Sequence, residues 1–211
     1  MSATSIYDQL RAAGMTKEGA CALFGNMVAE SALRSDNAQN GYGIDDKIYT
    51  MQADTGDQDF ASDGIGYGLC QWTKESRKTK LLYSAKAQGV SVGDETMQVQ
   101  FCIRELQDDF PGVWDELTSS YDLDECTKIV MDIYENPKIK NFTERLHCAQ
   151  LAMEFFPDDA SDACPIFPPD PSVMVIQMVM GYNGYWGKPD GQKSQEFFDN
   201  LRTFVNDMEK C

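Results

Sequence analysis

The chain has 211 residues, 42% of them hydrophobic and 25% charged, and a formal net charge of −16 at pH 7. This composition is typical of a globular protein, and the length predicts one larger domain and a smaller unit. The acidic charge argues against nucleic acid or another polyanion held through charge, so recognition of a glycan would depend on aromatic and hydrogen-bonding groups. No apolar run is long enough for a membrane span, and we expect no membrane association.

The cysteines and the N-terminus bear on redox state and place of synthesis. Seven cysteines, at positions 21, 70, 102, 126, 148, 164 and 211, form no CxxC pair, and several lie on apolar helical faces. This pattern favours reduced thiols that pack as small hydrophobic side chains. Because His147 is the single histidine, we expect no metal site and no cofactor. The stretch MSATSIYDQL lacks the basic and apolar regions of a signal peptide, so we expect synthesis in the cytoplasm without export by that route.

Helical periodicity dominates the first part of the chain. A helix is expected over residues 6–13, ending at Gly14, and Thr16 is a suitable N-cap for the next helix. Residues 35–63 break the pattern with glycines, polar residues and short apolar islands, which is typical of a small β-hairpin region or an irregular insertion. The expected fold class is mainly α (α+β), with this segment as its β part.

Further helices follow in the predicted order, over residues 69–87, 97–106 and 113–117. Asp122 is the expected N-cap of another helix, which Pro137 closes. Asn141 and Glu144 form a capping-box pattern ahead of the last helix of this part.

The composition shifts at residues 157–171, PDDASDACPIFPPDP, where five prolines and four aspartates exclude a continuous helix. We therefore expect a domain over residues 1–156, a linker over 157–171, and a small helical module over 172–211. A module of that size is marginal by itself and would lean on the larger domain or on another copy.

The stretch GNMVAESALRSD, residues 25–36, places an acid where the helical pattern favours an apolar residue. Glu30 continues the stripe that includes Leu23 and Met27. A carboxyl group on the core-facing side of a helix end is desolvated, which would raise the pKa of Glu30 and keep it protonated, as a general acid requires. The alternative is a helix-end glutamate that turns outward to Arg34 or to water.

A glycine-rich segment, DGIGYGLCQWT, covers residues 63–73. Its glycines allow a tight turn and a close approach of the backbone to a ligand. Tyr67 and Trp72 offer stacking faces, and the amide of Gln71 can both donate and accept hydrogen bonds, as sugar recognition requires. The alternative is a hairpin turn that leads into a core helix.

The two segments together resemble a known family. GMTKEGACALFGNMVAESAL, followed by GYGLCQWT, resembles the phage tail lysozyme family, within the lysozyme-like superfamily that includes goose-type lysozymes and soluble lytic transglycosylases. The resemblance covers about residues 6–155 and implies a lysozyme-like helical domain. In that superfamily a helix ends in a Glu-Ser pair whose glutamate is the acid, and a glycine-rich segment with a glutamine follows across the cleft. Glu30 and Ser31 match the first motif, and residues 68–71 match the second.

The resemblance implies a substrate and two mechanisms. The substrate would be the β-1,4 bond between N-acetylmuramic acid and N-acetylglucosamine in peptidoglycan, with Glu30 as the acid. Hydrolysis needs a second carboxylate, whereas a lytic transglycosylase can use its glutamate alone and leave 1,6-anhydro ends. Residues 35–63 supply the candidates, which are Asp36, Asp45, Asp46, Asp54, Asp57, Asp59 and Asp63. We expect Asp63, because the glycines anchor it beside Gln71.

Two further motifs allow more than one interpretation. YENP, residues 134–137, resembles a helix-end motif of the family in which Tyr134 would border the cleft, and it is also an ordinary helix stop. The acidic loop DTGDQDFASDG, residues 54–64, could hold calcium, but its spacing does not reproduce an EF-hand, so a solvated loop is favoured.

Residues 172–211 resemble a shortened peptidoglycan-binding repeat. Tyr182, Tyr185 and Trp186 would stack on sugar rings, or form the core of a miniature domain. The expected partner is the glycan strand of peptidoglycan, and the missing signal peptide fits either a lysin released through a holin or a component of the virion. A different class remains open, a noncatalytic wall-binding or tail structural protein that keeps the fold.

Overall fold

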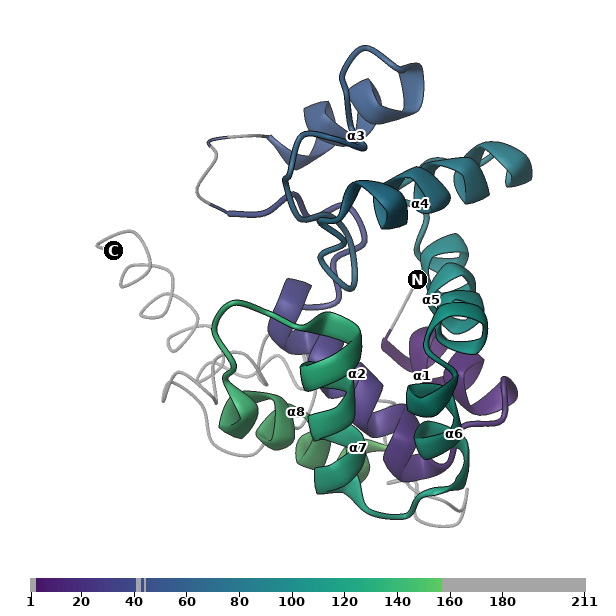
Figure 1. Cartoon of the computed structure of the whole chain (residues 1–211), viewed down its shortest axis with the longest axis vertical. Coiled ribbons are helices and arrows are strands. Elements are labelled where there is room, and N and C mark those ends of the chain that lie inside the picture. The colour runs from purple at the N-terminus through teal and green to yellow at the C-terminus, as the bar shows by residue number, and fades with distance from the viewer. Residues whose placement is uncertain (1–2, 41–42, 44, 157–211) are drawn as a thin grey trace, which may run out of the picture.

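The computed structural model describes residues 3–156, apart from residues 41, 42 and 44. The expected mainly α fold is confirmed within this part of the chain (Figure 1). Its elements are the helices α1 (Ala3–Ala12), α2 (Lys17–Ser31), α3 (Asp46–Thr55), α4 (Glu75–Gln88), α5 (Glu95–Asp109), α6 (Pro111–Ser119), α7 (Leu123–Ile129) and α8 (Phe142–Phe155), with a π-helical turn, η1 (Val130–Glu135), between the last two. The linker at 157–171 and the module at 172–211, with Tyr182, Tyr185 and Trp186, lie outside the described residues and stay predictions.

Helix α2 is the central element of the fold. Eleven of its 15 residues are buried, and its most extensive packing is against α8, followed by α7. The close α2–α8 contact depends on Gly25, since a Cβ atom there would lie 2.5 Å from the backbone nitrogen of Ala149. In Figure 1, α2, α7 and α8 lie in the lower half of the described part, and the C-terminal end of α2 points up toward the segment that carries α3 and α4.

Local signals explain where several helices begin. Thr16 caps α2, and its hydroxyl accepts a hydrogen bond from the Gly19 amide at 3.0 Å. Asp122 caps α7 by accepting from the amides of Asp124 and Glu125. Both predicted caps are therefore confirmed.

The β-hairpin expected in residues 35–63 is wrong, because α3 occupies this segment. Asp45 caps α3 by accepting from the Ile48 amide at 3.0 Å, and Gly56 ends it in the left-handed conformation. Strand-like pairing in the described residues is limited to isolated bridges, Ala38 with Tyr67 and Tyr67 with Trp72. The caps at Asp45 and Gly56 thus define a helix where the irregular hydrophobic pattern suggests a hairpin.

The helix expected over residues 69–87 begins later, at Glu75. Residues 67–72 instead form a tight turn closed by the bridge between Tyr67 and Trp72. Gly68 and Gln71 have φ angles of +75° and +46°, which a continuous helix does not tolerate. This turn is the element that faces the end of α2.

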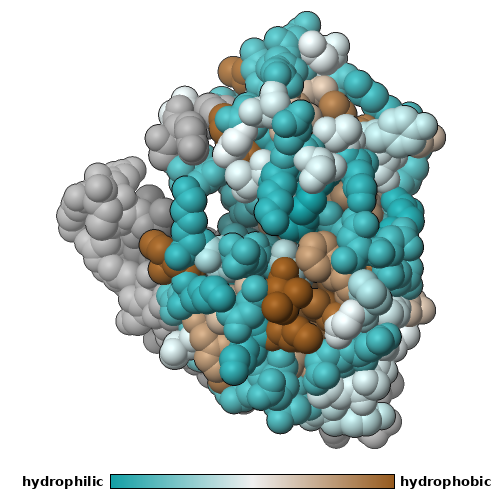
Figure 2. Space-filling view, viewed as in Figure 1, coloured by the Kyte–Doolittle hydropathy of each residue, from teal (hydrophilic) through white to brown (hydrophobic). Residues whose placement is uncertain are grey.

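The described residues share one hydrophobic core, to which α1 to α8 and η1 all contribute. The five described cysteines, Cys21, Cys70, Cys102, Cys126 and Cys148, are buried and form no disulfide. No helix in the described part is long and apolar enough to cross a membrane. Hydrophilic side chains cover most of the face shown in Figure 2, with a hydrophobic patch in its lower half.

Candidate functional site

The glycine-rich turn is bonded directly to the end of α2. The buried Ser31 hydroxyl donates to the Leu69 carbonyl at 3.0 Å, as well as to the Met27 carbonyl one turn back at 3.1 Å. The Leu69 amide donates to Gln98 Oε1 at 2.9 Å, and a Cβ on Gly68 would meet this same side chain at 2.5 Å. Ser31 and Gly68 therefore hold the end of α2 against the glycine-rich turn, the two segments that the family resemblance assigns to one site.

Glu30 lies one residue from the end of α2, and its side chain is 16% exposed. It forms an ion pair with Nη2 of Arg145, which projects from α8. Nη1 of the same guanidinium donates to Asn26 Oδ1 at 2.9 Å, one turn earlier on α2. One arginine thus spans two residues of one face of α2. The predicted alternative partner, Arg34, instead pairs with Asp36 and Asp46.

Glu135 is a second glutamate that acts on this site. It is the last residue of η1, a wider helical turn of the kind found often at functional sites, and Asn136 follows with φ of +45°. The Oε1 atom of Glu135 is buried and has no hydrogen-bond partner in the part of the chain that the structure describes. Burial raises the pKa of Glu135 well above its ordinary value, and the Glu30 carboxylate raises it further. Arg77 and Arg145 act in the opposite direction.

A buried network of hydrogen bonds and one ion pair supports the glycine-rich turn. Arg77 binds both oxygens of Glu105, each at 2.7 Å. Glu105 Oε2 also accepts from Trp72 Nε1 at 3.0 Å and from the Tyr134 hydroxyl at 2.9 Å. Arg77 in turn donates to the Tyr134 carbonyl at 3.1 Å and lies 4.5 Å from the centre of that ring. The network joins α4, α5 and η1 to the turn, so it fixes the wall of the site.

The predicted second carboxylate, Asp63, sits in another cluster. Its Oδ1 accepts from the buried ammonium group of Lys78 at 2.5 Å and from the Ile65 amide at 2.9 Å, and its Oδ2 accepts from the Tyr49 hydroxyl at 2.5 Å. Burial lowers the pKa of Lys78, and the bond to Asp63 opposes that effect. Both carboxylate oxygens of Asp63 are therefore engaged in anchoring α3 and α4, and its catalytic role stays a prediction.

The aromatic residues predicted to contact substrate are buried. Tyr67 and Trp72 have no exposed surface and Tyr134 is 1% exposed. The Tyr67 hydroxyl is 2.6 Å from the Thr50 hydroxyl. A buried ring has no free face for a sugar, so these side chains act through the wall that they build, and direct contact with a glycan stays a prediction.

Gln71 is only partly buried. Its Nε2 donates to the carbonyls of Asn37 and Gly68, both at 3.1 Å, which holds the amide beside the turn. Together with Ser31 and Glu30 it completes the set that the resemblance predicted for the site. The structure brings the two motifs together through the Ser31–Leu69 bond and the turn at Gly68.

The acidic loop at residues 54–64 binds the protein itself. Asp54 accepts from the Ser91 hydroxyl at 2.6 Å and from the Val92 amide at 2.7 Å, and Asp57 accepts from the Thr55 hydroxyl at 2.7 Å. Among the described residues, no group of three or more histidine, cysteine, aspartate or glutamate side chains is arranged to hold a metal ion.

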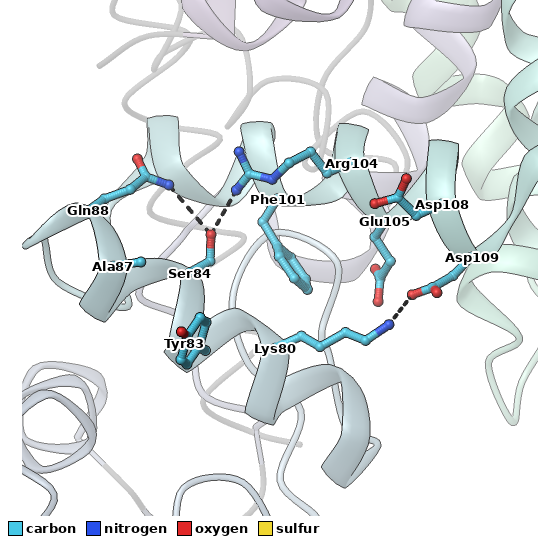
Figure 3. Close-up of a pocket in the computed structure, with 10 residues that line it drawn as sticks. All are labelled: Lys80, Tyr83, Ser84, Ala87, Gln88, Phe101, Arg104, Glu105, Asp108 and Asp109. Atoms are coloured by element: carbon cyan, nitrogen blue, oxygen red, sulfur yellow. Dashed lines mark hydrogen bonds and ion pairs between the residues drawn. The ribbon is translucent and has the colours of Figure 1, made fainter.

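A separate groove of about 430 Å³ lies between α4 and α5 (Figure 3). Its polar side chains pair across it, with Lys80 Nζ 2.5 Å from Asp109 Oδ2 and Arg104 Nη2 2.7 Å from the Ser84 hydroxyl. Its lining includes Glu105 but neither Glu30 nor Glu135, so this groove is distinct from the site at the end of α2.

Sequence reasoning missed Arg145, although a signal for it exists. Arg145 precedes Cys148, Ala149 and Ala152 at spacings of three, four and seven residues, and all four are buried on one face of α8. A charge on an apolar stripe is the same signal that nominated Glu30. Glu135 carried no such signal, because η1 is not α-helical and its register departs from the periodicity used.

Comparison with known proteins agrees with this geometry. A family model described as phage tail lysozyme matches residues 1–156, which include α2, the glycine-rich turn and the YENP motif. Among curated proteins, the comparison finds no match. Since the family model spans most of the chain and the motif residues meet at the end of α2, the chain belongs to the phage tail lysozyme family.

Proposed function

We propose that this protein degrades peptidoglycan by cleaving the β-1,4 bond between N-acetylmuramic acid and N-acetylglucosamine, with Glu30 as the proton donor. One observation carries the proposal. Glu30 is a partly exposed carboxylate at the end of the buried helix α2, and its neighbour Ser31 is bonded to the glycine-rich turn of a phage tail lysozyme domain. General acid catalysis from a fixed carboxyl group is the chemistry that this bond requires.

The surrounding residues support a fixed position for Glu30. Arg145 holds Glu30 and Asn26 together, and Asn26 Nδ2 donates to the Ala22 carbonyl at 2.8 Å, so the acid is tied to a rigid helix on one side. On the other side, the Arg77–Glu105 network fixes the turn. Because its neighbours are bonded, the Glu30 carboxyl group is held in position for proton transfer before substrate binds.

Hydrolysis is our first choice, and lytic transglycosylation is the second. The second choice is favoured by one observation, namely that both oxygens of Asp63 are already bound to Lys78, Tyr49 and Ile65. Mass spectrometry of digested cell wall separates the two reactions, because hydrolysis leaves reducing muramic acid ends and transglycosylation leaves 1,6-anhydro ends. Products with only anhydro ends would overturn the choice of hydrolysis.

The proposal is tested with Glu30→Gln, which keeps the size of the side chain and removes its acid. We expect turnover of purified peptidoglycan to fall about a hundredfold or more, with binding to sedimented cell wall retained. Glu18→Gln, at the other end of α2, is the matched control and should keep wild-type turnover. If Glu30→Gln kept its turnover, or if the wild type had none, the noncatalytic wall-binding alternative would replace the enzyme.

A further inference from the structure

The site at the end of α2 holds an excess of carboxyl groups over cations. Arg77 is bonded to Glu105 on both oxygens, and Arg145 is paired with Glu30. Arg77 and Arg145 both act electrostatically on Glu135, yet each of them is already paired with another glutamate. Three mostly buried glutamates therefore share two guanidinium groups.

A third negative charge in this setting would be costly. A carboxylate in a low-dielectric environment needs hydrogen bonds or a cation of its own, and Glu135 Oε1 is buried with no partner among the described residues. A neutral carboxyl group avoids the cost, because retaining one proton brings the three glutamates and two arginines to balance.

We propose that Glu135 is the second carboxyl group of this site, and that it keeps a proton in the resting enzyme beside the ion pair of Glu30 with Arg145. Burial and the Glu30 carboxylate both raise the pKa of Glu135, which agrees with the charge count. This inference rests on the proposed function, in which Glu30 must deliver a proton to the glycosidic oxygen.

The other groups that face Glu135 fit this assignment. Cys102, on α5, is buried and adds no positive charge that could hold a carboxylate. Glu144, on α8, lies near Glu30 and Arg145 and accepts from Asn141 Nδ2 at 2.7 Å. Glu144 is partly exposed, and its own partner is Asn141.

The proposed cycle conserves the proton. Glu30 delivers a proton to the glycosidic oxygen as the bond from that oxygen to the anomeric carbon breaks. The proton held at Glu135 reaches Glu30 through water, because Glu135 Oε1 is bonded to no side chain of the described part. Water adds to the anomeric carbon and returns one proton to the glutamate pair. The Nε atom of Arg145 is buried and has no hydrogen-bond partner in the described structure, so this guanidinium has a donor in reserve for Glu135 once Glu135 is ionised.

The proton can be located without reference to activity. In the full chain with ¹³C-labelled glutamate, we expect one carboxyl signal to titrate well above the ordinary range for glutamate. This signal should be absent from Glu135→Gln. In Glu30→Gln it should titrate at lower pH, because Arg145 is then free to pair with Glu135. If every glutamate ionised in the ordinary range, or if the high-titrating signal belonged to Glu30, the assignment would be overturned whatever the enzyme's substrate.

The pH profile of turnover tests whether the proton is used. Glutamine mimics a neutral carboxyl group, so a merely structural Glu135 would leave the profile of Glu135→Gln unchanged. We expect instead about a tenfold loss at neutral pH, with most of the activity recovered in acid, where Glu30 can be protonated from solvent.

The matched control is Glu144→Gln, which removes a carboxyl group that faces Glu30 and Arg145 but has a partner of its own. It should keep a profile close to that of the wild type. An equal shift in both variants would assign the effect to general electrostatics and contradict the proposal. An inactive wild type with the high-titrating Glu135 signal present would refute the proposed function alone.

Discussion

Within the described residues, two arginine–glutamate pairs are largely buried, and they differ in how completely their polar atoms are bonded. Around Arg77 and Glu105, both carboxylate oxygens are bonded, and Trp72 and Tyr134 add further donors. Around Arg145 and Glu30, the Arg145 Nε atom has no partner within the described residues. The same is true of Glu135 Oε1 nearby.

This difference indicates different roles. A saturated network rigidifies the fold, whereas buried donors and acceptors left without partners cost stability and are retained where a ligand or a proton uses them. The Arg77–Glu105 network is thus the support, and the glutamates beside Arg145 are the reactive part. Both sit on the same framework of α2, the glycine-rich turn and η1. The predictions that follow test this distinction by stability and by turnover.

The largest effect on stability is expected from Glu105→Gln. It removes the charge that balances Arg77 in a buried site, so the free energy of unfolding should fall by about 3–5 kcal/mol. Urea unfolding followed by circular dichroism measures this, with Asp108→Asn, an exposed change on the same helix, as the control. A variant as stable as the wild type would show that the network is not the support we describe.

Asp63→Asn should have an intermediate effect. It weakens the bonds to Lys78 and Tyr49, and we expect a loss of about 1–3 kcal/mol in the free energy of unfolding. At a temperature where the variant is folded, turnover should stay near that of the wild type. A hundredfold drop in turnover at unchanged stability would instead make Asp63 the second catalytic carboxylate.

A smaller, pH-dependent effect is expected from Glu135. Because the pKa of Glu135 is raised in the folded state, the folded protein binds more protons than the unfolded chain above the ordinary value of 4.5. This contribution to stability is complete below that value and declines as pH rises through the folded pKa. The melting temperature of the wild type should therefore fall, relative to that of Glu135→Gln, as the pH rises from 4.5 through the folded pKa. If the melting temperatures of the two proteins changed in parallel with pH, the raised pKa of Glu135 would be contradicted.

The smallest effect is expected at the groove between α4 and α5. Lys80 and Asp109 form an exposed pair there, so Lys80→Ala should change the free energy of unfolding by about 0.5 kcal/mol or less (Figure 3). Peptidoglycan turnover should also be unchanged. A large loss of turnover in Lys80→Ala would instead indicate that the substrate binds in this groove.

The sequence by itself determined much of the fold and half of the site. Periodicity and capping residues predicted most of the described helices, including the caps at Thr16 and Asp122. The acid on the stripe of α2 and the glycine-rich segment were read directly from the sequence. These features are encoded by residues close together in the chain, where spacing determines which side chains share a face.

Tertiary structure decided what surrounds the acid. Arg145 lies 115 positions from Glu30, and Glu135 lies on a π-helical turn whose register the α-helical period does not describe. The bond from Ser31 to Leu69 and the engagement of Asp63 by Lys78 likewise depend on how helices pack. Charge balance in a buried site is a sum over every element that meets there, so no local stretch of sequence fixes which carboxyl group keeps its proton.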